Sequence, residues 1–371
     1  MKSKVLTIYL PQFHSIPEND EWWGNGFTEW TNVRRGRNFY QGHYQPRIPY
    51  QNDYYDLSDL KVLEHHIRLA QKAKIAGFAF YHYYFAGKKL LEKPIENYRN
   101  RSKEQFPYCL IWANQSWTRT WYRANVGKQS LLPQIYGGED AWREHFDYML
   151  EFFKDNRYIK VKNKPIYIIY LPQDIKCRKE MFDLWNRLAI QNGFDGIYLI
   201  AMNTGWGVDK SKNLYDAYMN FEPMHAIGLD LSYRKQLQGV KAEHMNEVNK
   251  EKSTLRNRLF AQNAFSYQYL CKQIETFPLE SGLKTYMGVF PGWDNTSRKD
   301  EAGWIVPGST PKKFGKHIEK MLHCSEKLGN EYLFLNAWNE WSEGAYIEPD
   351  QKYGYAYLNE LRKSIMKYEK N

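Results

Sequence analysis

The sequence YLFLNAWNEWSEGAYIE spans residues 332–348 and runs from an apolar strand directly into two carboxylates. Its first half is almost continuously apolar or aromatic, which is typical of a strand buried on both faces of a parallel sheet. Glu340 and Glu343 follow three positions apart, with a tryptophan between them. In parallel barrels the reacting side chains lie at the carboxyl ends of the strands. The stretch therefore predicts a parallel strand with a functional site at its end.

Seven other apolar segments share the character of this strand and alternate with helical patterns. They occupy residues 5–10, 77–85, 108–113, 165–171, 196–202, 217–221 and 286–290. Between them, apolar residues recur with helical spacing, as at Leu60, Leu63 and Ile67, and Thr310 with Pro311 provides the cap and first turn of a late helix. Eight such units predict an α/β fold, a single (β/α)8 barrel of the TIM type. The alternative, an open doubly wound sheet, is disfavoured because no G-x-G-x-x-G motif follows a strand.

Two regions interrupt this alternation. Residues 14–55 form a long loop after the first strand that is rich in Trp, Tyr, Pro and Gly, and long ordered loops in compact domains are usually functional. Residues at about 224–284 are polar and predict a partly helical insertion after the sixth strand. Because barrels of this length occur as single units, we expect residues 1–371 to form one catalytic domain.

The amino-acid composition and the net charge limit the kinds of molecule that the protein is expected to bind. The net charge of +10 could favour nucleic acid, an anionic membrane surface or a diphosphate-bearing substrate. The densest basic stretches, residues 250–258 and 312–320, also contain glutamates, so they indicate solvated helix faces and nucleic acid is not expected. Trp, Tyr and Phe make up 17% of the residues, which suits sugar binding, although aromatic side chains also fill cores.

No motif points to a cofactor or a metal ion. The four cysteines lie far apart without zinc or redox spacing, and no Walker A, H-E-x-x-H, D-x-D or G-x-S-x-G motif occurs. The N-terminus lacks the apolar core of a signal peptide, and no apolar run reaches the length of a membrane span. We therefore expect a cytoplasmic location, with peripheral association at the inner face of the membrane left open.

Polar and aromatic residues gather just after the predicted strands and in the long first loop. We expect these residues to bind a saccharide substrate. They are Gln12, His14, Trp22, Trp23, Glu29, Trp30, Tyr81, His82, Lys88, Trp112, Asn114, Trp117, Asn203, Glu222, Trp293, Asp294, Asn339 and Trp341. Some have plainer interpretations: His82 would be a core histidine, the stem of Lys88 would cover apolar surface, and Glu222 would be a structural hydrogen-bond acceptor.

Glu340 and Glu343 are the candidate catalytic residues. Glycosyl transfer needs one group to manage the leaving oxygen and another to stabilise or attack the anomeric carbon, and paired Asp or Glu side chains perform both tasks. Trp338 and Trp341 could stack on sugar rings and, by excluding water, raise the pKa of a nearby carboxyl group. The alternative is that the two glutamates are solvated charges of a loop.

Several long motifs together resemble the WbsX-type family of bacterial polysaccharide-biosynthesis proteins, which are usually called glycosyltransferases. The motifs are residues 9–14 (YLPQFH), 19–24 (NDEWWG), 26–33 (GFTEWTNV), 42–46 (GHYQP), 112–114 (WAN), 338–341 (WNEW) and 343–344 (EG). The resemblance covers nearly the whole chain. It implies a role in making a bacterial surface polysaccharide, such as an O-antigen or a capsule.

The C-terminal segment is also similar to that of endo-α-mannosidases of glycoside hydrolase family 99, which are (β/α)8 barrels. The similarity rests on residues 339–341, 343–344 and 347–349. It implies retention through a 1,2-anhydro sugar, which forms when one glutamate deprotonates the sugar 2-hydroxyl and that oxygen attacks the anomeric carbon. Glu340 would be this base, Glu343 would act as acid and then base, and no metal is implied.

We therefore expect a carbohydrate-active enzyme. A retaining glycosyltransferase is preferred, because a cytoplasmic enzyme meets nucleotide- or lipid-linked sugars more often than polymers. An endo-acting glycoside hydrolase or transglycosidase is the first alternative, since a glutamate-bearing barrel is what hydrolases use. A non-catalytic sugar-binding barrel is the second alternative, and a nucleic-acid-binding barrel is suggested by the charge alone.

Overall fold

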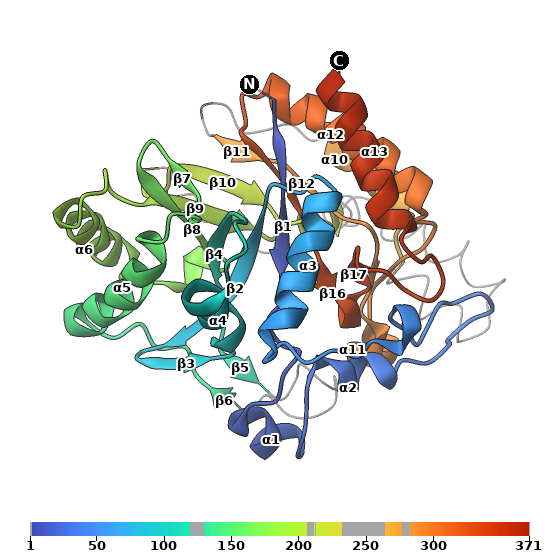
Figure 1. Ribbon diagram of the computed structural model, residues 1–371, viewed down its shortest axis with the longest axis horizontal. Coiled ribbons are helices and arrows are strands. Elements are labelled where there is room, and N and C mark those ends of the chain that lie inside the picture. The colour runs from blue at the N-terminus through green and yellow to red at the C-terminus, as the bar shows by residue number, and fades with distance from the viewer. Residues whose placement is uncertain are drawn as a thin grey trace, which may run out of the picture.

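The computed structural model of the protein describes residues 2–118, 130–205, 211, 213–231, 264–276, 282 and 284–370 (Figure 1). The predicted insertion at about 224–284 is only partly covered by these ranges. Within it, residues 224–231 are helical and helix α10 spans Tyr267–Thr276. The rest of the insertion lies mainly outside the described residues, so its extent stays a prediction.

The centre of the fold is a parallel sheet that closes on itself. Its strands are β1 (Lys4–Tyr9), β2 (Gly77–Phe85), β4 (Tyr108–Trp112), β8 (Lys164–Ile169), β9 (Tyr198–Asn203), β10 (Ala217–Asn220), β11 (Thr285–Tyr286), β12 (Gly288–Val289) and β15 (Tyr332–Leu335). From β1 to β10 each strand pairs in parallel with the next one named, and β15 pairs in parallel with β1. These pairings exclude the open doubly wound sheet.

Two short strands together fill the seventh position of the barrel. Strand β11 pairs with β10, whereas β12 pairs with β15, and Met287 lies between the two strands. The Met287 carbonyl oxygen accepts a hydrogen bond of 3.0 Å from the amide of Phe334 in β15. The circle of eight strand positions is thereby completed, which confirms the predicted (β/α)8 barrel of the TIM type.

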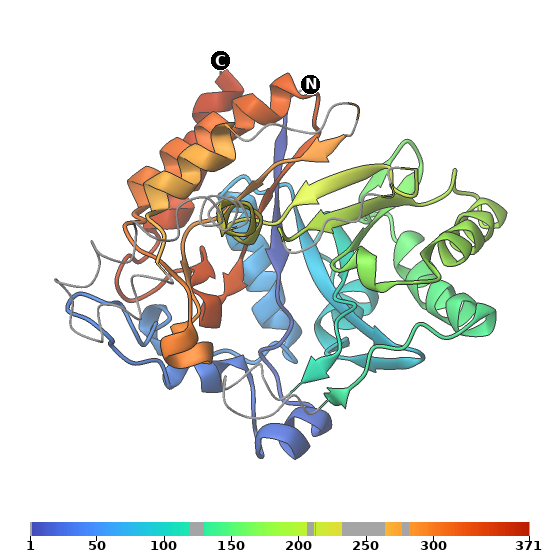
Figure 2. The same ribbon diagram turned by 180° about the vertical axis from the view of Figure 1, so that it is seen from behind.

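Helices cover the outside of the barrel (Figures 1 and 2). The long ones are α3 (Leu60–Lys72), α4 (Lys93–Arg101), α5 (Glu139–Phe153), α6 (Arg178–Gln191), α10, α12 (Pro311–Lys327) and α13 (Ala356–Lys370). Helix α3 buries Leu63 and Ile67, as their helical spacing predicts. At the start of α12 the Thr310 hydroxyl accepts a hydrogen bond of 3.3 Å from the amide of Lys313, and Pro311 occupies the first turn. This confirms the predicted cap.

Short helices and short strands surround the barrel, mostly near the ends of its strands. Helical segments are α1 (Pro17–Trp23), α2 (Glu29–Arg34), η1 (Tyr50–Asn52), η3 (Pro172–Asp174), α11 (Thr296–Lys299), η4 (Asp300–Ala302) and η5 (Trp341–Glu343). Short strands are β3 (Lys88–Leu90), β5 (Trp117–Thr118), β6 (Ser130–Leu132), β7 (Lys160–Val161), β13 (Trp293–Asp294), β14 (Ile305–Val306), β16 (Asn339–Glu340) and β17 (Ala345–Tyr346).

The first loop and the C-terminal motif meet at the same end of the barrel. In Figures 1 and 2, α1, α2, α11 and β16 lie at the end toward which β1 runs. The side chain of Asn339 fixes β16 there: its Oδ1 accepts from the Leu10 amide at 2.8 Å, and its Nδ2 donates to the Leu10 carbonyl at 2.9 Å. Asn339 thus mimics a strand pairing and holds the residue that follows it, Glu340, beside the end of β1.

Candidate active site

A cavity of about 180 Å³ lies at the carboxyl end of the barrel and contains both predicted catalytic carboxylates. The ends of β1, β2, β4, β8 and β10 contribute to its wall, together with the segments around β13 and β16. The lining residues are Leu10, Gln12, Tyr81, Tyr83, Ala113, Gln115, Trp117, Tyr170, Phe221, Met224, Trp293, Asn295, Arg298, Glu340 and Glu343. The wall is rich in aromatic rings, and this end of a barrel is where barrel enzymes hold their substrates.

A tight turn carries the two glutamates. Glu340 ends β16 and Glu343 ends η5, and Gly344 closes the turn in the left-handed conformation with φ of 62°. A Cβ atom on Gly344 would lie 3.0 Å from the backbone nitrogen of Asp294. Glycine is therefore required both by the backbone angle and by the close approach of the segment that contains Trp293.

Arg298 of α11 links the carboxylates of the cavity. Its Nη1 donates to Glu343 Oε1 at 2.7 Å, and its Nη2 donates to Glu29 Oε1 at 2.6 Å. Nη2 also lies 4.0 Å from Glu340 Oε2. Glu29, which was expected to bind substrate, thus reaches the site through Arg298. One guanidinium contacts three carboxylates, so the protonation of each carboxylate depends on the others.

Burial has the largest effect on the pKa values of Glu340 and Glu343. It raises the pKa of Glu340 well above its usual range, the charge of Glu343 raises that pKa further, and Arg298 opposes both effects. Burial also raises the pKa of Glu343, although Arg298 lowers it. Within the described part of the chain, Glu340 Oε2 is buried and has no hydrogen-bond partner. Burial therefore favours the protonated form of both carboxyl groups, and Arg298 opposes this effect at each.

Four of the residues expected to bind substrate line this cavity, namely Gln12, Tyr81, Trp117 and Trp293. Gln12 is oriented by a hydrogen bond of 2.8 Å from its Nε2 to the hydroxyl of Tyr83. Trp22, from the long first loop, lies behind Trp117, with the two ring centroids 5.7 Å apart in an edge-on arrangement. The first loop therefore supports one wall of the cavity.

His82 and Trp112 do not line the cavity, because successive side chains of a strand point to opposite faces. Tyr81 and Tyr83 face the cavity, so His82 between them faces helix α5 instead. There its Nε2 lies 3.0 Å from Nε2 of His145. Trp112 packs against the same histidine, with ring centroids 4.6 Å apart. Both residues belong to the layer between the barrel and its helices.

The tryptophans of the C-terminal motif also lie outside the cavity. Trp338 and Trp341 donate from their Nε1 atoms to the two carboxylate oxygens of Glu348, at 2.7 and 2.5 Å. Burial raises the pKa of Glu348 to about 8, although these hydrogen bonds and one from Tyr55 lower it. Trp30 packs against Trp341, with ring centroids 5.5 Å apart. These rings support the turn that carries the glutamates rather than facing the cavity.

The remaining expected residues lie elsewhere in the structure. They are His14, Trp23, Lys88, Asn114, Asn203, Glu222, Asp294 and Asn339. Lys88 forms an ion pair of 2.8 Å with Glu18, and Asn114 exchanges two hydrogen bonds of 2.7 and 2.8 Å with the backbone of Leu171. Glu222 accepts from the amide of Ala226 at 3.0 Å. These contacts connect strand ends and loops to their neighbours.

His14, Trp23 and Asn203 make local contacts as well. His14 Nδ1 lies 3.0 Å from the carbonyl oxygen of Pro11. The ring of Trp23 lies 6.0 Å from that of Phe27. Asn203 donates to Asn220 at 3.3 Å across the neighbouring strands β9 and β10.

Several lining residues were not singled out from the sequence. Tyr83 could have been found, because it lies two positions from Tyr81 and so shares its face of the strand. Tyr170 could have been found, because it is the penultimate residue of the fourth predicted strand, residues 165–171. Arg298 carries no comparable signal, since a lone arginine in a polar segment is usually solvated.

Two kinds of feature are missing from the described ranges. No group of three or more His, Cys, Asp or Glu side chains is placed to hold a metal ion there. Nor do these ranges contain a helix with the length and hydropathy needed to cross a membrane.

The fold is similar to that of two solved structures. The GH99 endo-alpha-mannosidase from Bacteroides thetaiotaomicron matches with a TM-score of 0.58 and 13% identity, over 99% of this chain and 97% of that one. A structure described as a glycoside hydrolase-like protein matches with a TM-score of 0.57 and 14% identity, over 98% of this chain and 94% of that one. At such low identities these similarities concern the fold alone.

The chain also matches a relative and a protein family in sequence. The protein WxcX of Xanthomonas campestris pv. campestris (strain B100), itself uncharacterized, is 32% identical over 370 residues, which are 98% of this chain and 50% of WxcX. The chain thus spans about half the length of this relative. Residues 5–361 match the family described as Glycosyltransferase WbsX. The chain therefore belongs to the WbsX glycosyltransferase family.

Proposed function

We propose that this protein is a retaining glycosyltransferase that builds or remodels a bacterial surface polysaccharide of the O-antigen or capsule type. One observation carries the proposal: Glu340 and Glu343 share an aromatic-walled cavity at the carboxyl end of a (β/α)8 barrel. Membership of the WbsX family supports the choice of transfer. The proposed substrate is a saccharide linked to a nucleotide or a lipid, and residues 1–371 act as one catalytic domain. Peripheral membrane association remains a prediction from the net charge of +10.

In the proposed first step, Glu340 takes the proton of the sugar 2-hydroxyl, which is carried by the carbon next to the anomeric carbon. That oxygen attacks the anomeric carbon while the bond to the leaving oxygen breaks, and Glu343 gives its proton to the leaving oxygen. In the second step the acceptor hydroxyl opens the 1,2-anhydro ring, its proton passes to Glu343, and Glu340 returns its proton to the sugar oxygen. Two inversions give net retention. These roles follow the resemblance of residues 339–349 to glycoside hydrolase family 99.

The surroundings of Glu340 support its role as a base once a sugar is bound. Its Oε2 accepts no hydrogen bond from any described residue. A sugar hydroxyl that donates to this atom would stabilise the ionised carboxylate and so lower its pKa. The negative charge on Glu340 would then raise the pKa of the neighbouring Glu343, which would keep the proton that the leaving oxygen needs.

An endo-acting glycoside hydrolase or a transglycosidase is the second candidate. The similarity of the fold to a GH99 endo-alpha-mannosidase favours it. A sugar-binding barrel without catalysis is less well supported, because both carboxylates reach the cavity.

The two enzymatic candidates differ in their need for an activated donor. The purified protein would be incubated with a panel of nucleoside diphosphate sugars plus oligosaccharide acceptors, and separately with the oligosaccharides alone. A transferase consumes the donor and extends the acceptor, and proton NMR should show the anomeric configuration of the donor in the product. New reducing ends from oligosaccharides without any donor would overturn transfer in favour of hydrolysis.

A further inference from the structure

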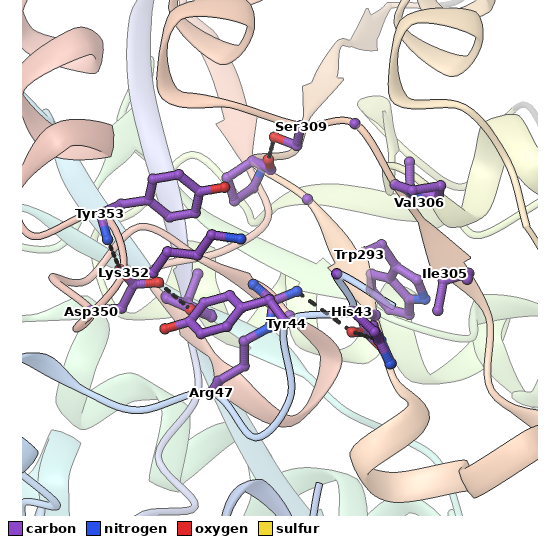
Figure 3. A pocket seen from close by; sticks show the side chains of 18 of the residues that line it. His43, Tyr44, Arg47, Trp293, Ile305, Val306, Ser309, Asp350, Lys352 and Tyr353 are labelled. Atoms are coloured by element: carbon purple, nitrogen blue, oxygen red, sulfur yellow. Dashed lines mark hydrogen bonds and ion pairs between the residues drawn. The ribbon is translucent and has the colours of Figure 1, made fainter. Parts of the chain in front are cut away.

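A second cavity of about 140 Å³ has Trp293 in its wall, as the first cavity does. Figure 3 shows the side chains that line this second cavity. Its walls come from residues 40–47 of the first loop, from the segments around β13 and β14, and from residues 344–357 near the C-terminus. Gly344 belongs to this wall, and it directly follows Glu343 of the first cavity. A Cβ atom on Gly344 would lie 3.3 Å from Nη2 of Arg47, so the two cavities approach closely at this residue.

The carboxylates of the second cavity are already occupied by protein donors. Asp294 accepts from His43 at 2.8 Å, from Gln45 at 2.9 Å and from the Thr296 hydroxyl at 2.6 Å, and it lies 3.5 Å from Arg47 Nη2. Burial raises the pKa of Asp294, but the hydrogen bond from His43 and the charge of Arg47 lower it more, to about 2. Asp294 is therefore ionised and saturated.

Asp350 and His43, which also line the cavity, already have hydrogen-bond partners in the protein as well. Asp350 accepts from the Tyr346 hydroxyl at 2.7 Å and from the amide of Tyr353 at 2.5 Å. His43 Nδ1 accepts from the Phe39 amide at 3.2 Å, and Nε2 on the other side of the ring lies within hydrogen-bond distance of Asp294. The carboxylates of Asp294 and Asp350 and Nδ1 of His43 thus already have protein donors, whereas the buried hydroxyl of Tyr44 has no hydrogen-bond partner among the described residues.

Two hydrogen-bond donors of the cavity, in contrast, lack acceptors. Arg47 Nε and Trp293 Nε1 are both buried, and the structure as described provides no hydrogen-bond acceptor for either. The ammonium of Lys352 lies 4.7 Å from the ring centroid of Tyr44 and 5.2 Å from that of Tyr353, at the exposed side of the cavity. A buried N–H group without an acceptor is unfavourable, so a ligand that supplies acceptors would be stabilised here.

We propose that the second cavity binds an oxyanion of the saccharide substrate, held by Arg47, Lys352 and Trp293. This inference rests on the proposed function, which makes the substrate a saccharide that enters the adjoining cavity. Oxyanions supply several acceptors and negative charge, and they form the strongest hydrogen bonds with guanidinium and ammonium groups. The oxyanion is a phosphate of an activated donor or the carboxylate of an acidic sugar. Trp293 lines both cavities, so one substrate can occupy them together.

Isothermal titration calorimetry with the whole protein tests the inference. The probes are inorganic pyrophosphate, D-glucuronate and the neutral sugar D-glucose. We expect at least one of the two anions to bind more tightly than D-glucose, and its affinity to fall at least tenfold in Arg47→Met and in Lys352→Met. Binding of pyrophosphate alone identifies a phosphate, and binding of D-glucuronate alone identifies an acidic sugar. The matched control is Lys179→Met, whose lysine is exposed on α6 and pairs with Asp183.

Two variants distinguish a loss of anion binding from misfolding and from a loss of catalysis. Because Lys352 is exposed, Lys352→Met is expected to fold even if loss of the buried Arg47 destabilises the chain. Glu340→Gln lies outside this cavity and should bind the anions like the wild type, so loss of the proposed catalysis would leave anion binding intact. Binding of neither anion, equal binding of D-glucose, or wild-type affinity in Lys352→Met and Arg47→Met would overturn the proposal.

Discussion

At the scale of single residues, Arg298 has the largest predicted effect on the candidate site. Replacing it with methionine leaves Glu29 and Glu343 buried without their cation. Removing one partner of a buried ion pair typically destabilises a protein by about 3–5 kcal/mol. We expect Arg298→Met to lower the free energy of unfolding by that amount at pH 7 in a urea titration.

The control for this prediction is Arg34→Met. Arg34 is exposed at the end of α2 and stacks on Tyr54 with its Cζ 4.0 Å from the ring centroid. Its replacement should change stability by less than about 1 kcal/mol. The double variant Glu29→Gln with Arg298→Met should recover part of the loss, since one unpaired charge is removed. An Arg298→Met protein as stable as Arg34→Met would show that the cluster is not held by charge.

From the sequence, a side chain could be assigned to the cavity only where a local rule, such as the alternation of side chains along a strand, determines its direction. Strand alternation separates Tyr83, which lines the cavity, from His82, which does not, and it could have been applied from the sequence. The tryptophans beside Glu340 suggested sugar stacking, yet they donate to Glu348. Their direction depends on a tight turn whose shape follows from contacts with distant segments.

At the scale of elements, the packing of β2 on α5 makes stability depend on pH. Burial lowers the pKa of His82 to about 3, and it also lowers the pKa of His145. The unfolded chain binds protons at these imidazoles below about pH 6.5, whereas the native protein does not, so stability is full above that pH and falls on acidification. Replacing His82 with phenylalanine removes one such group.

We therefore expect the loss of unfolding free energy between pH 7.5 and 5.5 to be smaller in His82→Phe by about 1.4 kcal/mol. Chemical unfolding at the two pH values measures this difference. His65→Phe, on the exposed face of α3, serves as the control and should keep the wild-type difference. An unchanged difference in His82→Phe would mean that His82 titrates in the native protein.

Helix α12 provides a second prediction at this scale. Thr310 caps its first turn through the amide of Lys313. Loss of such a cap usually destabilises a protein by about 1 kcal/mol. Thr310→Ala should lower the free energy of unfolding by this amount, whereas Thr310→Ser retains the hydroxyl and should be close to the wild type. Equal losses in both variants would indicate that the methyl group matters rather than the cap.

The main elements could be predicted because their sequences carry strong local signals. All eight predicted strands overlap observed ones, and only the seventh is divided, at Met287. The short strands β13, β14, β16 and β17 were not predicted. Each has two residues, too few to show a periodic pattern, so tertiary contacts determine them.

At the scale of the whole molecule, the closed barrel brings together segments that no local pattern connects. His43 and Asp294 are 251 positions apart and form a buried hydrogen bond, and Glu29 and Arg298 are 269 positions apart. The barrel, and the end of it where the candidate site lies, were predictable from the repeated strand ends. The second cavity was not, because its walls combine the first loop with two C-terminal segments.

We propose that Glu340 and Glu343 carry out glycosyl transfer at the carboxyl end of this barrel. The most direct test is the turnover of an identified glycosyl donor by Glu340→Gln and Glu343→Gln. The matched control is Glu331→Gln, at the opposite end of β15, where Glu331 binds Lys284 at 2.6 Å. General acid–base catalysis typically contributes about 10²–10⁴-fold, so each site variant should lose at least about 100-fold in kcat while the control stays within a factor of three. If the site variants keep the wild-type kcat, Glu340 and Glu343 are not catalytic.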